Sequence, residues 1–419
     1  MWCNSEDCML TGTHMPQFKS ALLRLLDERG YIHQLTDAEG LDALASAAIV
    51  PTYIGFDATA PSLHVGSLVQ IMLLRRLQQT GHKPIVLMGG GTTKVGDPSG
   101  RDESRKLLDD VTIQANIASI RRVFERFLVF DDGPTGAILV DNDEWLGRLG
   151  YIDFLRGIGP HFTINRMLTF DSVRIRLERE QPLTFLEFNY MIMQAYDFLE
   201  LHRRYGCLVQ MGGSDQWGNI VNGVDLARRV EGTQLFGGTT PLMTTADGAK
   251  MGKTAAGAVW LNGDLLSAYD YWQYWRNTAD ADVGRFLRRF TELPMDEVRR
   301  LEALEGAEIN AAKKVLADLA TAMAHGEEAA REAGETARRT FEEGASGDAL
   351  PTLKVSREIS LVDALVGLGL CASKNEARRL IAQGAAKVDG EKAEEDCTIA
   401  VAGEVRISAG KKKHGLLTP

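Results

Sequence analysis

Residues 57–67 combine a histidine, a threonine and a glycine at a point where phosphates commonly bind. The sequence DATAPSLHVGS links a strand-like stretch to a helix-like one. The start of a helix offers free N–H groups and a partial positive charge, which attract phosphates. His64 and Thr59 would add donors, and Gly66 would let a ligand approach the backbone closely. The alternative is an ordinary strand–helix loop with a capping histidine.

Residues 247–254 end like a Walker A phosphate loop without following its pattern. The sequence is DGAKMGKT, and Asp247 stands where Walker A requires a glycine. Lys250 and Lys253, together with Thr254, would instead clamp a polyphosphate as it departs. A solvated basic loop is the alternative interpretation.

The glycine-rich segment 89–101 also resembles a phosphate loop and also departs from it. In GGGTTKVGDPSGR, the second glycine of the spacing is followed by Asp97 and not by lysine. An acid in this position suits a ligand ammonium group better than a phosphate, whereas Arg105, further along, could face an anion. A glycine-rich surface turn is the alternative.

Two further segments carry polar groups that suit a small ligand. Tyr190, Gln194 and Asp197 have the spacing i, i+4 and i+7, so they share one face of a predicted helix among apolar neighbours. Such a polar stripe predicts either a bound ligand with polar ends or a buried hydrogen-bond network. Residues 210–219, QMGGSDQWGN, offer acids and amides that suit ribose hydroxyls and an adenine edge, but they lack the GxGxxG pattern.

Alternating strands and helices would position these segments. The predicted strands are 53–56, 85–88, 137–140 and 207–210, and the predicted helices are 16–46, 65–79, 104–129, 184–206 and 219–230. This alternation indicates an α/β fold with a parallel, Rossmann-like sheet. From about residue 265 to 345 the chain is rich in Ala, Leu, Glu and Arg, which predicts a helical region.

Composition bounds the class of protein. The chain has 419 residues, is 44% hydrophobic and carries a net charge of −10, so a disordered or collagen-like chain is excluded and two or three domains are expected. The part from Pro351 to Pro419 holds 11 basic and 9 acidic residues, and this slight positive excess suggests an anionic partner. Five scattered cysteines fit a reducing compartment, and no apolar run is long enough to span a membrane.

Taken together, these segments resemble the class I aminoacyl-tRNA synthetases, and specifically the bacterial tyrosyl-tRNA synthetases. HVGS at 64–67 stands at the HIGH signature, and KMGKT at 250–254 stands at the KMSKS signature. The strings YIGFDATAPSLHVGS, GDPSGR, YMIMQAYDF and GGSDQWGN follow the tyrosyl pattern closely. The resemblance extends over nearly the whole chain from about residue 18.

The resemblance implies a role for each matching residue. The phenol hydroxyl of tyrosine would be held by Tyr53 and Asp197. The rest of the amino acid would be held by Gly55, Asp97, Tyr190, Gln194 and Gln210. ATP would be bound by Asp57, Gly66, Gly213, Asp215, Gln216 and Lys253. The phosphates in the transition state would be stabilised by Thr59, His64, Arg105, Lys250, Lys253 and Thr254. Two departures from the family, Ser67 for the second histidine of HIGH and Ile54 for a cysteine, affect groups near the ribose.

The C-terminal part resembles the RNA-binding module of a ribosomal small-subunit protein. A helix is predicted over 372–381, capped by Ser373, and Lys374, Arg378 and Arg379 on it are candidate phosphate contacts, as is the lysine run 411–413. A solvated helix face is the alternative. The expected organisation is a tail (1–17), a catalytic Rossmann-like domain (18–262), a helical anticodon-recognition domain (263–343), a linker (344–351) and a C-terminal RNA-binding module (352–419).

The implied activity is the activation of L-tyrosine with ATP, followed by transfer of tyrosine to the 3′ end of tRNA(Tyr). Mg²⁺ would arrive with ATP, without a metal site in the protein. The resemblance also implies a homodimer that acts in the cytoplasm. Two rival readings stay open: a tryptophanyl-tRNA synthetase, and an RNA-binding or regulatory protein built on an inactive synthetase core.

Overall fold

The chain of the computed structural model packs into two compact units. The structure describes residues 18–98, 108–246, 248, 251–254, 257–341, 350–355, 357–393, 395–410 and 413–419, without the side chains of residues 171, 172, 253, 254, 340 and 341. The first unit contains the chain up to Ser267 together with Gln273–His325. The second contains Ala268–Trp272 together with Gly326–Pro419.

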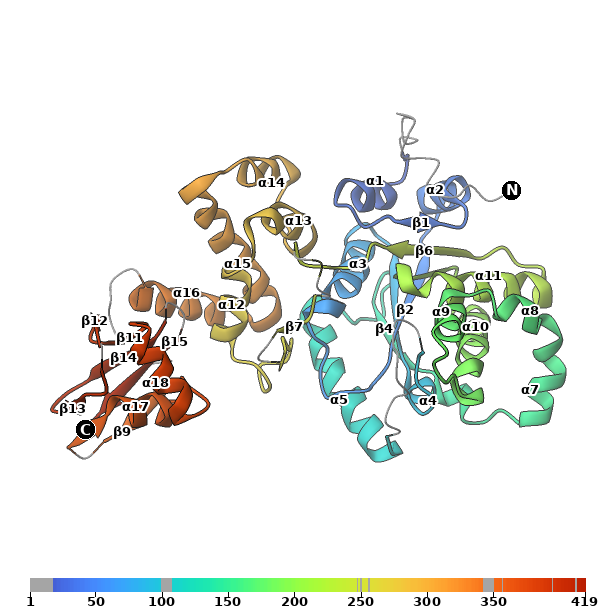
Figure 1. Ribbon diagram of the computed structural model, residues 1–419. Coiled ribbons are helices and arrows are strands. Elements are labelled where there is room, and N and C mark those ends of the chain that lie inside the picture. The colour runs from blue at the N-terminus through green and yellow to red at the C-terminus, as the bar shows by residue number, and fades with distance from the viewer. Residues whose placement is uncertain are drawn as a thin grey trace. The chain divides into compact units, whose positions relative to one another are not determined.

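A six-stranded sheet forms the centre of the first unit (Figure 1). Its strands are β1 (Gln34–Leu35), β2 (Pro51–Phe56), β3 (Lys83–Met88), β4 (Ile138–Asp141), β5 (Val209–Gly213) and β6 (Phe236–Thr240). They lie in the order β1-β6-β5-β2-β3-β4, and all neighbours are parallel except β1 and β6. Most residues of β2 and β3 are buried, as is typical of a parallel sheet covered on both faces. The predicted α/β class is confirmed.

The strand order reverses between β2 and β5. From β2 the chain adds β3 and β4 on one side, whereas β5 and β6 are added on the other. In sheets of this kind, ligands bind outside the carboxyl ends of the strands at the point where the order reverses. The segments that follow Phe56 and Gly213 therefore start at this point.

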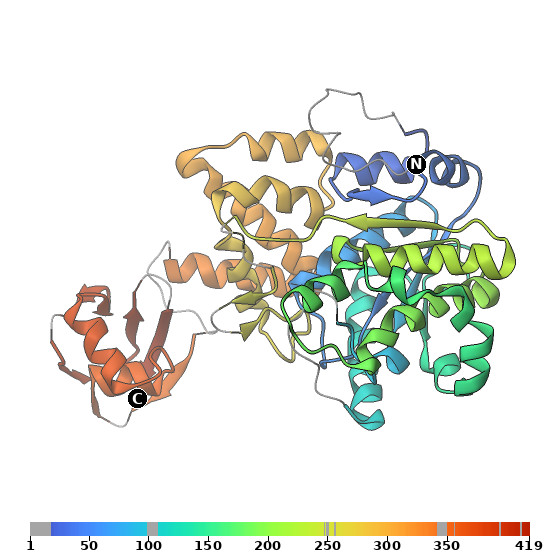
Figure 2. The ribbon, with the colours of Figure 1, turned by 45° about the vertical axis from the view of Figure 1, so that its right-hand side comes forward.

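Helices cover both faces of the sheet (Figure 1 and Figure 2). The long ones are α3 (Leu68–Gln79), α5 (Asp110–Phe127), α10 (Phe185–Tyr205) and α11 (Trp217–Glu231). Successive side chains of a strand point to opposite faces. Accordingly, Tyr53 of β2 packs against Phe198 of α10, whereas Phe56 packs against Phe124 of α5. A capping box of Thr184 and Glu187 begins α10 and fixes where its polar stripe starts.

The remaining elements of the sheet region are short. They are η1 (Val65–Ser67), α4 (Gly90–Thr93), α6 (Asp143–Leu146), α7 (Tyr151–Gly157), η2 (Gly159–His161), α8 (Ile164–Met167), α9 (Asp171–Glu178), η3 (Ser214–Gln216), β7 (Lys253–Thr254) and β8 (Gly257–Ala258). One prediction near the N-terminus is wrong. The single helix expected over 16–46 is divided, within the described residues, into α1 (Ala21–Glu28) and α2 (Ala38–Ala47). Gly30 adopts a left-handed conformation (φ 74°) after α1, and β1 then pairs with β6.

Helices follow the sheet. They are α12 (Ala268–Arg276), α13 (Asp280–Phe290), α14 (Met295–Glu302), η4 (Gly306–Glu308), α15 (Ile309–His325) and α16 (Glu327–Phe341). Within the first unit, Trp275 packs against Phe286 and Phe290 of α13. The buried Arg29 guanidinium donates hydrogen bonds to the carbonyl oxygens of Thr291 and Leu293, just after α13, at 3.1 and 2.7 Å. These bonds attach α13 to the sheet region.

The C-terminal part of the second unit is a small α+β module. Its five-stranded sheet has the order β12-β11-β14-β15-β9, and a two-stranded sheet pairs β10 with β13. The elements are β9 (Thr352–Lys354), β10 (Glu358–Ser360), α17 (Leu361–Gly367), α18 (Lys374–Ala382), β11 (Ala386–Val388), β12 (Glu391–Lys392), β13 (Thr398–Ala400), β14 (Val405–Ala409) and β15 (Lys413–Thr418). Ser360 and Ser373 cap the two helices, and the core includes Leu365, Ile381 and Ile407. Among the described helices of the whole chain, none has the length and apolar character that a membrane span requires.

Candidate active site

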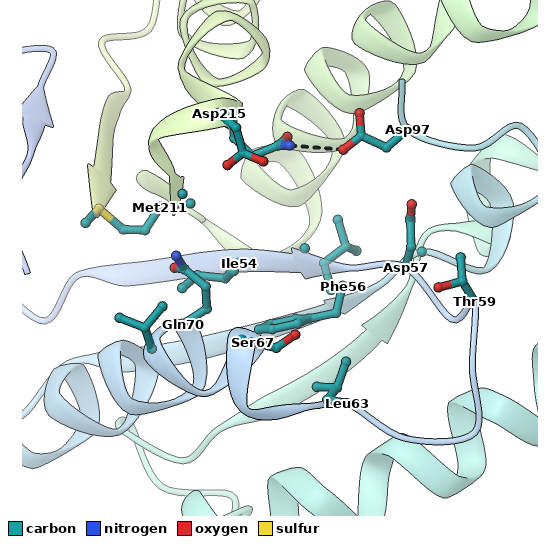
Figure 3. Close-up of a pocket in the computed structure, with 18 of the residues that line it drawn as sticks. Ile54, Phe56, Asp57, Thr59, Leu63, Ser67, Gln70, Asp97, Met211 and Asp215 are labelled. Atoms are coloured by element: carbon teal, nitrogen blue, oxygen red, sulfur yellow. Dashed lines mark hydrogen bonds between the residues drawn. The ribbon is translucent and has the colours of Figure 1, made fainter. Parts of the chain in front are cut away.

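A cavity of about 650 Å³ lies at the carboxyl ends of the strands, where the strand order reverses (Figure 3). The structure brings fourteen residues that the sequence singled out into the lining of this one cavity. They are Tyr53, Gly55, Asp57, Thr59, His64, Gly66, Asp97, Tyr190, Gln194, Asp197, Gln210, Gly213, Asp215 and Gln216. These residues come from segments that are up to 163 positions apart in the chain, so the sheet is what assembles them.

A buried carboxyl group, Asp197, lies on the α10 side of the cavity. Its two oxygens accept hydrogen bonds from Asn142 Nδ2 at 2.9 Å and from Trp145 Nε1 at 2.7 Å. Burial raises the pKa of Asp197 to about 8, although the two hydrogen bonds act in the opposite direction. The negative charges of Asp57 and Asp141 raise this pKa further.

Two more buried polar atoms lie near this carboxyl group. The Tyr53 side chain is 1% exposed, and its hydroxyl has no hydrogen-bond partner among the described residues. Burial, and then the charge of Asp197, raise the pKa of Tyr53 well above its usual value, so the phenol stays protonated and can donate. The side-chain oxygen of Gln210 is likewise buried without a partner among the described residues. Because unpaired buried polar groups are costly, this end of the cavity is suited to a polar ligand.

A second polar group surrounds Asp57, directly after β2. Its Oδ1 accepts a hydrogen bond from Thr92 Oγ1 at 3.0 Å, and its Oδ2 accepts one from the Tyr190 hydroxyl at 3.3 Å. A side chain at Gly89 would bring a Cβ within 2.4 Å of both Asp57 Oδ1 and Thr92 Oγ1. A larger residue at this position would therefore displace the Asp57 and Thr92 side chains from their hydrogen bond.

Amide side chains connect the two walls of the cavity. Gln216 donates a hydrogen bond to Asp97 Oδ2 at 2.9 Å, which is the dashed line in Figure 3. Asn219 Nδ2 donates to Gln216 Oε1 at 3.0 Å and to Gln194 Oε1 at 3.1 Å. The predicted ammonium-binding residues Asp97 and Gln194 are thus linked by hydrogen bonds through Gln216 and Asn219, which follow β5.

The two signature segments lie against each other. His64 Nδ1 accepts a hydrogen bond from the Gly66 N–H at 3.0 Å, which leaves the other ring nitrogen, Nε2, to carry the proton of a neutral imidazole. A Cβ at Gly66 would lie 2.5 Å from the Met251 carbonyl oxygen, so only glycine fits. The Val65 N–H donates to the Val259 carbonyl at 2.9 Å, and His64 forms an isolated β-bridge with Trp260.

Some predicted residues are described only in part. Lys250 and Arg105 lie outside the described residues. For Lys253 and Thr254 the backbone alone is described, in β7, which pairs antiparallel with β8. The structure therefore places the backbone of Met251 and Gly252 beside HVGS.

The two positions that depart from the family pattern, Ser67 and Ile54, both line the cavity. Figure 3 shows them together with Gln70 and Met211. Gln70 Nε2 donates a hydrogen bond to Thr240 Oγ1 at 2.8 Å. Ile54 stands where the family often has a cysteine. It is 2% exposed and has no polar side-chain atom, so it cannot form a hydrogen bond through its side chain.

Sequence reasoning assigned no individual role to four polar residues of the site. Thr92, Asn142 and Trp145 hold the two aspartates, and Asn219 joins the glutamines. Asn142 and Trp145 follow the end of β4, and a polar run directly after a predicted strand was the signal that could have found Asn142. Among the described residues, no group of three or more His, Cys, Asp or Glu side chains is placed to hold a metal ion.

The C-terminal candidates lie on α18. Lys374, Arg378 and Arg379 are all exposed. Lys374 Nζ lies 2.6 Å from Asp363 Oδ1, so this cation is shared with a neighbouring acid. Of the predicted lysine run, residues 411 and 412 lie outside the described residues, and Lys413 Nζ donates to the Leu370 carbonyl at 3.0 Å.

Comparison with known proteins shows the family of the chain. Residues 48–342 match the family model for class I tRNA synthetases (W and Y), and residues 340–416 match the model for the SYY-like C-terminal domain of tyrosine–tRNA ligase. The fold is thus that of a class I tRNA synthetase. Similar curated proteins include tyrosine–tRNA ligases from Zymomonas mobilis, 69% identical over 406 residues, and from Novosphingobium aromaticivorans, 66% identical over 406 residues. Each alignment covers 96% of this chain and 99% of the relative.

A solved structure of a tyrosyl-tRNA synthetase is also similar to this chain. A C-terminally truncated mitochondrial tyrosyl-tRNA synthetase from Aspergillus nidulans superposes with a TM-score of 0.69 at 30% identity, covering 78% of this chain and 95% of that one. The chain belongs to the tyrosine–tRNA ligase family of class I synthetases.

Proposed function

We propose that this chain is a tyrosine–tRNA ligase. It joins L-tyrosine and ATP into tyrosyl-adenylate with release of pyrophosphate, and it then transfers the tyrosyl group to the 3′ end of tRNA(Tyr). The observation that carries the choice of amino acid is the buried polar cluster of Tyr53, Asp197 and Gln210, in which two atoms have no partner among the described residues.

A phenol hydroxyl fits this cluster better than the alternatives do. It can donate to Asp197 and at the same time accept from Tyr53. An indole N–H only donates, so tryptophan would leave the Tyr53 hydroxyl unpaired, and phenylalanine would pair with neither Tyr53 nor Asp197. The cluster therefore supports tyrosine over the tryptophanyl reading.

The other end of the amino acid is proposed to lie near the linked polar side chains. Asp97 offers a carboxylate to the ammonium group, and Gln194 and the Tyr190 hydroxyl offer further hydrogen bonds. Support comes from the lining of the cavity, to which all three contribute. Gly55 is exposed to the cavity, and a Cβ built on it meets no atom within 4 Å, which leaves room for the substrate.

ATP is proposed to occupy the part of the cavity between β2 and the segment after β5. Gly213, Asp215 and Gln216 are assigned to the nucleoside, with Asp57 and Gly66 nearby. Because Ile54 has no polar side-chain atom, we expect Asp215 to hold the ribose without help from that position. Mg²⁺ is proposed to arrive on the phosphates.

The chemical step needs positioning and charge stabilisation more than covalent help. The tyrosine carboxylate oxygen attacks the α-phosphorus of ATP, a P–O bond forms, and the bond to the leaving pyrophosphate breaks. Negative charge accumulates on the phosphates as the bond breaks. Donors placed for that charge are proposed to be Thr59, His64, Arg105, Lys250, Lys253 and Thr254. The His64 Nε2–H is suited to donate, since Nδ1 already accepts from Gly66.

Transfer RNA is proposed to be recognised by the C-terminal half of the chain. Residues 263–343 would read the anticodon region, and residues 352–419 would bind RNA through Lys374, Arg378 and Arg379. The match of residues 340–416 to the C-terminal domain model supports an assignment to RNA, as does the exposure of the three cations.

A homodimer in the cytoplasm is also proposed. Of fifteen exposed large apolar side chains among the described residues, nine lie between Tyr151 and Leu186, a concentration that a second copy of the chain would cover. Cys207, Cys371 and Cys397 are free thiols, which fits a reducing compartment. Sedimentation of the wild type against an Ile164→Glu variant tests the dimer: a variant that sediments like the wild type contradicts this surface.

The deciding experiment is ATP–pyrophosphate exchange with tyrosine, tryptophan and phenylalanine in turn. Exchange that depends on tyrosine alone supports the proposal. Exchange with tryptophan would identify the other member of the class. If no amino acid supports exchange while tRNA still binds, the chain is an RNA-binding protein with an inactive synthetase core.

A further inference from the structure

Helix α13 contacts the chain that enters the KMGKT segment. Asp282, in the first turn of α13, accepts a hydrogen bond from the Ala246 backbone N–H at 2.8 Å. One turn later, Arg285 donates to the Thr244 carbonyl oxygen at 2.5 Å and also pairs with Asp282. The two side chains therefore both bind the backbone of residues 244–246: Asp282 accepts from an N–H group and Arg285 donates to a carbonyl oxygen.

This contact is partly shielded from water. The Asp282 side chain is 4% exposed and that of Arg285 is 33% exposed. Hydrogen bonds to ionised groups are stronger than neutral ones, and burial limits screening of the pair. We call Asp282 and Arg285 the α13 clamp.

Backbone hydrogen bonds lead from the clamp to both signature segments. The Met251 N–H donates to the Met243 carbonyl at 2.9 Å, so the residue just before the clamped segment is bonded to Met251 of the signature segment. The Val259 N–H donates to Gly252 at 3.1 Å, and the Val65 N–H donates to Val259. Met243 itself lines the cavity. A shift of residues 243–246 would therefore move atoms on the phosphate side of the cavity.

The tyrosine side of the cavity is built from other elements. Asp197 and Tyr190 lie on α10, and Tyr53 lies in the middle of β2. None of the hydrogen bonds given above for these three residues comes from residues 243–246. Loss of the clamp should consequently affect the phosphate chemistry and leave tyrosine binding unchanged.

We propose that Asp282 and Arg285 are positioning residues for adenylate formation: they hold residues 244–246 so that the backbone of residues 251–254 stays in register with HVGS. This inference rests on the proposed function, because it concerns the rate of that reaction. The clamp touches neither substrate, and it acts through the segment it holds.

The chain offers a matched control on the same helix. Arg288 is 38% exposed and pairs with Glu302, so it resembles Arg285 in exposure and in having one acidic partner. Its side chain pairs instead with Glu302, the last residue of α14. Arg285→Met and Arg288→Met therefore each remove one positive charge, but only Arg285→Met removes the hydrogen bond to the Thr244 carbonyl oxygen.

The test is single-turnover adenylate formation with tyrosine and ATP both saturating, alongside the Kd of tyrosine and the thermal unfolding of each variant. Arg285→Met should lower the rate by about 10- to 100-fold, the scale of a small misplacement of groups around a reacting centre. Its Kd for tyrosine should stay within about twofold of the wild-type value, because the variant removes no contact that binds tyrosine in the ground state. Asp282→Asn should show a smaller loss, since the amide oxygen can still accept from Ala246.

Three outcomes would overturn the inference. They are a wild-type rate in Arg285→Met, an equal loss of rate in Arg288→Met, and a loss of tyrosine affinity as large as the loss of rate. A general folding defect would appear as the second or third of these. If the wild-type enzyme itself forms no adenylate, the proposed function fails, and that result is distinct from any difference between the variants.

Discussion

Replacing Tyr53 by phenylalanine should change stability and specificity in opposite directions. The Tyr53 hydroxyl is buried and has no partner among the described residues, so the ligand-free protein carries the cost of desolvating it. Removing the hydroxyl removes that cost. With tyrosine bound, the same hydroxyl is proposed to donate to the phenol oxygen, so its removal also removes a hydrogen bond that phenylalanine never makes.

The expected sizes follow from these two states. An unsatisfied buried polar group costs about 1–3 kcal/mol, so Tyr53→Phe should raise the free energy of unfolding of the ligand-free protein by up to that amount. A neutral hydrogen bond contributes about 0.5–1.5 kcal/mol net, so the ratio of kcat/KM for tyrosine over phenylalanine should fall about two- to tenfold.

Tyr31 provides a matched control. It is as deeply buried as Tyr53, but its hydroxyl donates to the Arg289 carbonyl at 2.5 Å. Tyr31→Phe should therefore lower the free energy of unfolding by about 0.5–1.5 kcal/mol and leave the tyrosine/phenylalanine ratio unchanged. Urea unfolding and pyrophosphate exchange measure the two quantities. If both variants are destabilised equally, or if Tyr53→Phe keeps the wild-type ratio, the reasoning about an unpaired phenol is wrong.

Three further predictions concern charge. Asp197 holds its proton to a pKa of about 8 in the folded protein, against 3.8 for an unperturbed carboxyl group. The folded protein therefore binds this proton more tightly than the unfolded chain does, and the stability that this supplies is present at low pH and is lost as the pH rises from about 4 to about 8. The free energy of unfolding of wild type, relative to that of Asp197→Asn, should fall over that range. A difference between the two proteins that does not change with pH would contradict the raised pKa. Lys253→Ala should slow single-turnover adenylate formation by about 10²–10³ with little change in tyrosine Kd, and weak tyrosine binding at a normal rate would refute its role. Arg378→Ala combined with Arg379→Ala should weaken tRNA binding and reduce its salt dependence by about two counterions, whereas an unchanged salt slope would exclude phosphate contacts.

Much of the site could be predicted because local sequence decides where strands end. Apolar stretches at 53–56 and 207–210 indicated strands, and the polar residues that follow them had to lie at one edge of a parallel sheet. The helical spacing of Tyr190, Gln194 and Asp197 was also a local property, and the structure places all three in the cavity lining. Patterns of this kind depend on a few neighbouring residues.

The parts that could not be predicted depend on contacts between distant residues. Asn142 and Trp145 hold Asp197 from 55 and 52 positions away, and nothing near either residue in the sequence indicates that partner. The division of the predicted N-terminal helix has the same origin, since Gln34 and Leu35 become a strand by pairing with Thr239 and Gly238. In each case a contact between residues far apart in the sequence determined the structure, and the local sequence pattern did not.

The same unpaired atoms link stability to substrate choice. In the ligand-free protein the Tyr53 hydroxyl, the Gln210 oxygen and the buried Asp197 carboxyl all oppose folding, because burial has removed their water without supplying full compensation. A bound tyrosine hydroxyl pairs with two of them, so its binding energy includes the relief of a cost that folding has already imposed. Phenylalanine has the same ring but relieves none of it. Discrimination therefore needs no steric exclusion: it follows from keeping the cluster buried, with the Tyr53 hydroxyl and the Gln210 oxygen unpaired among the described residues until the correct side chain arrives.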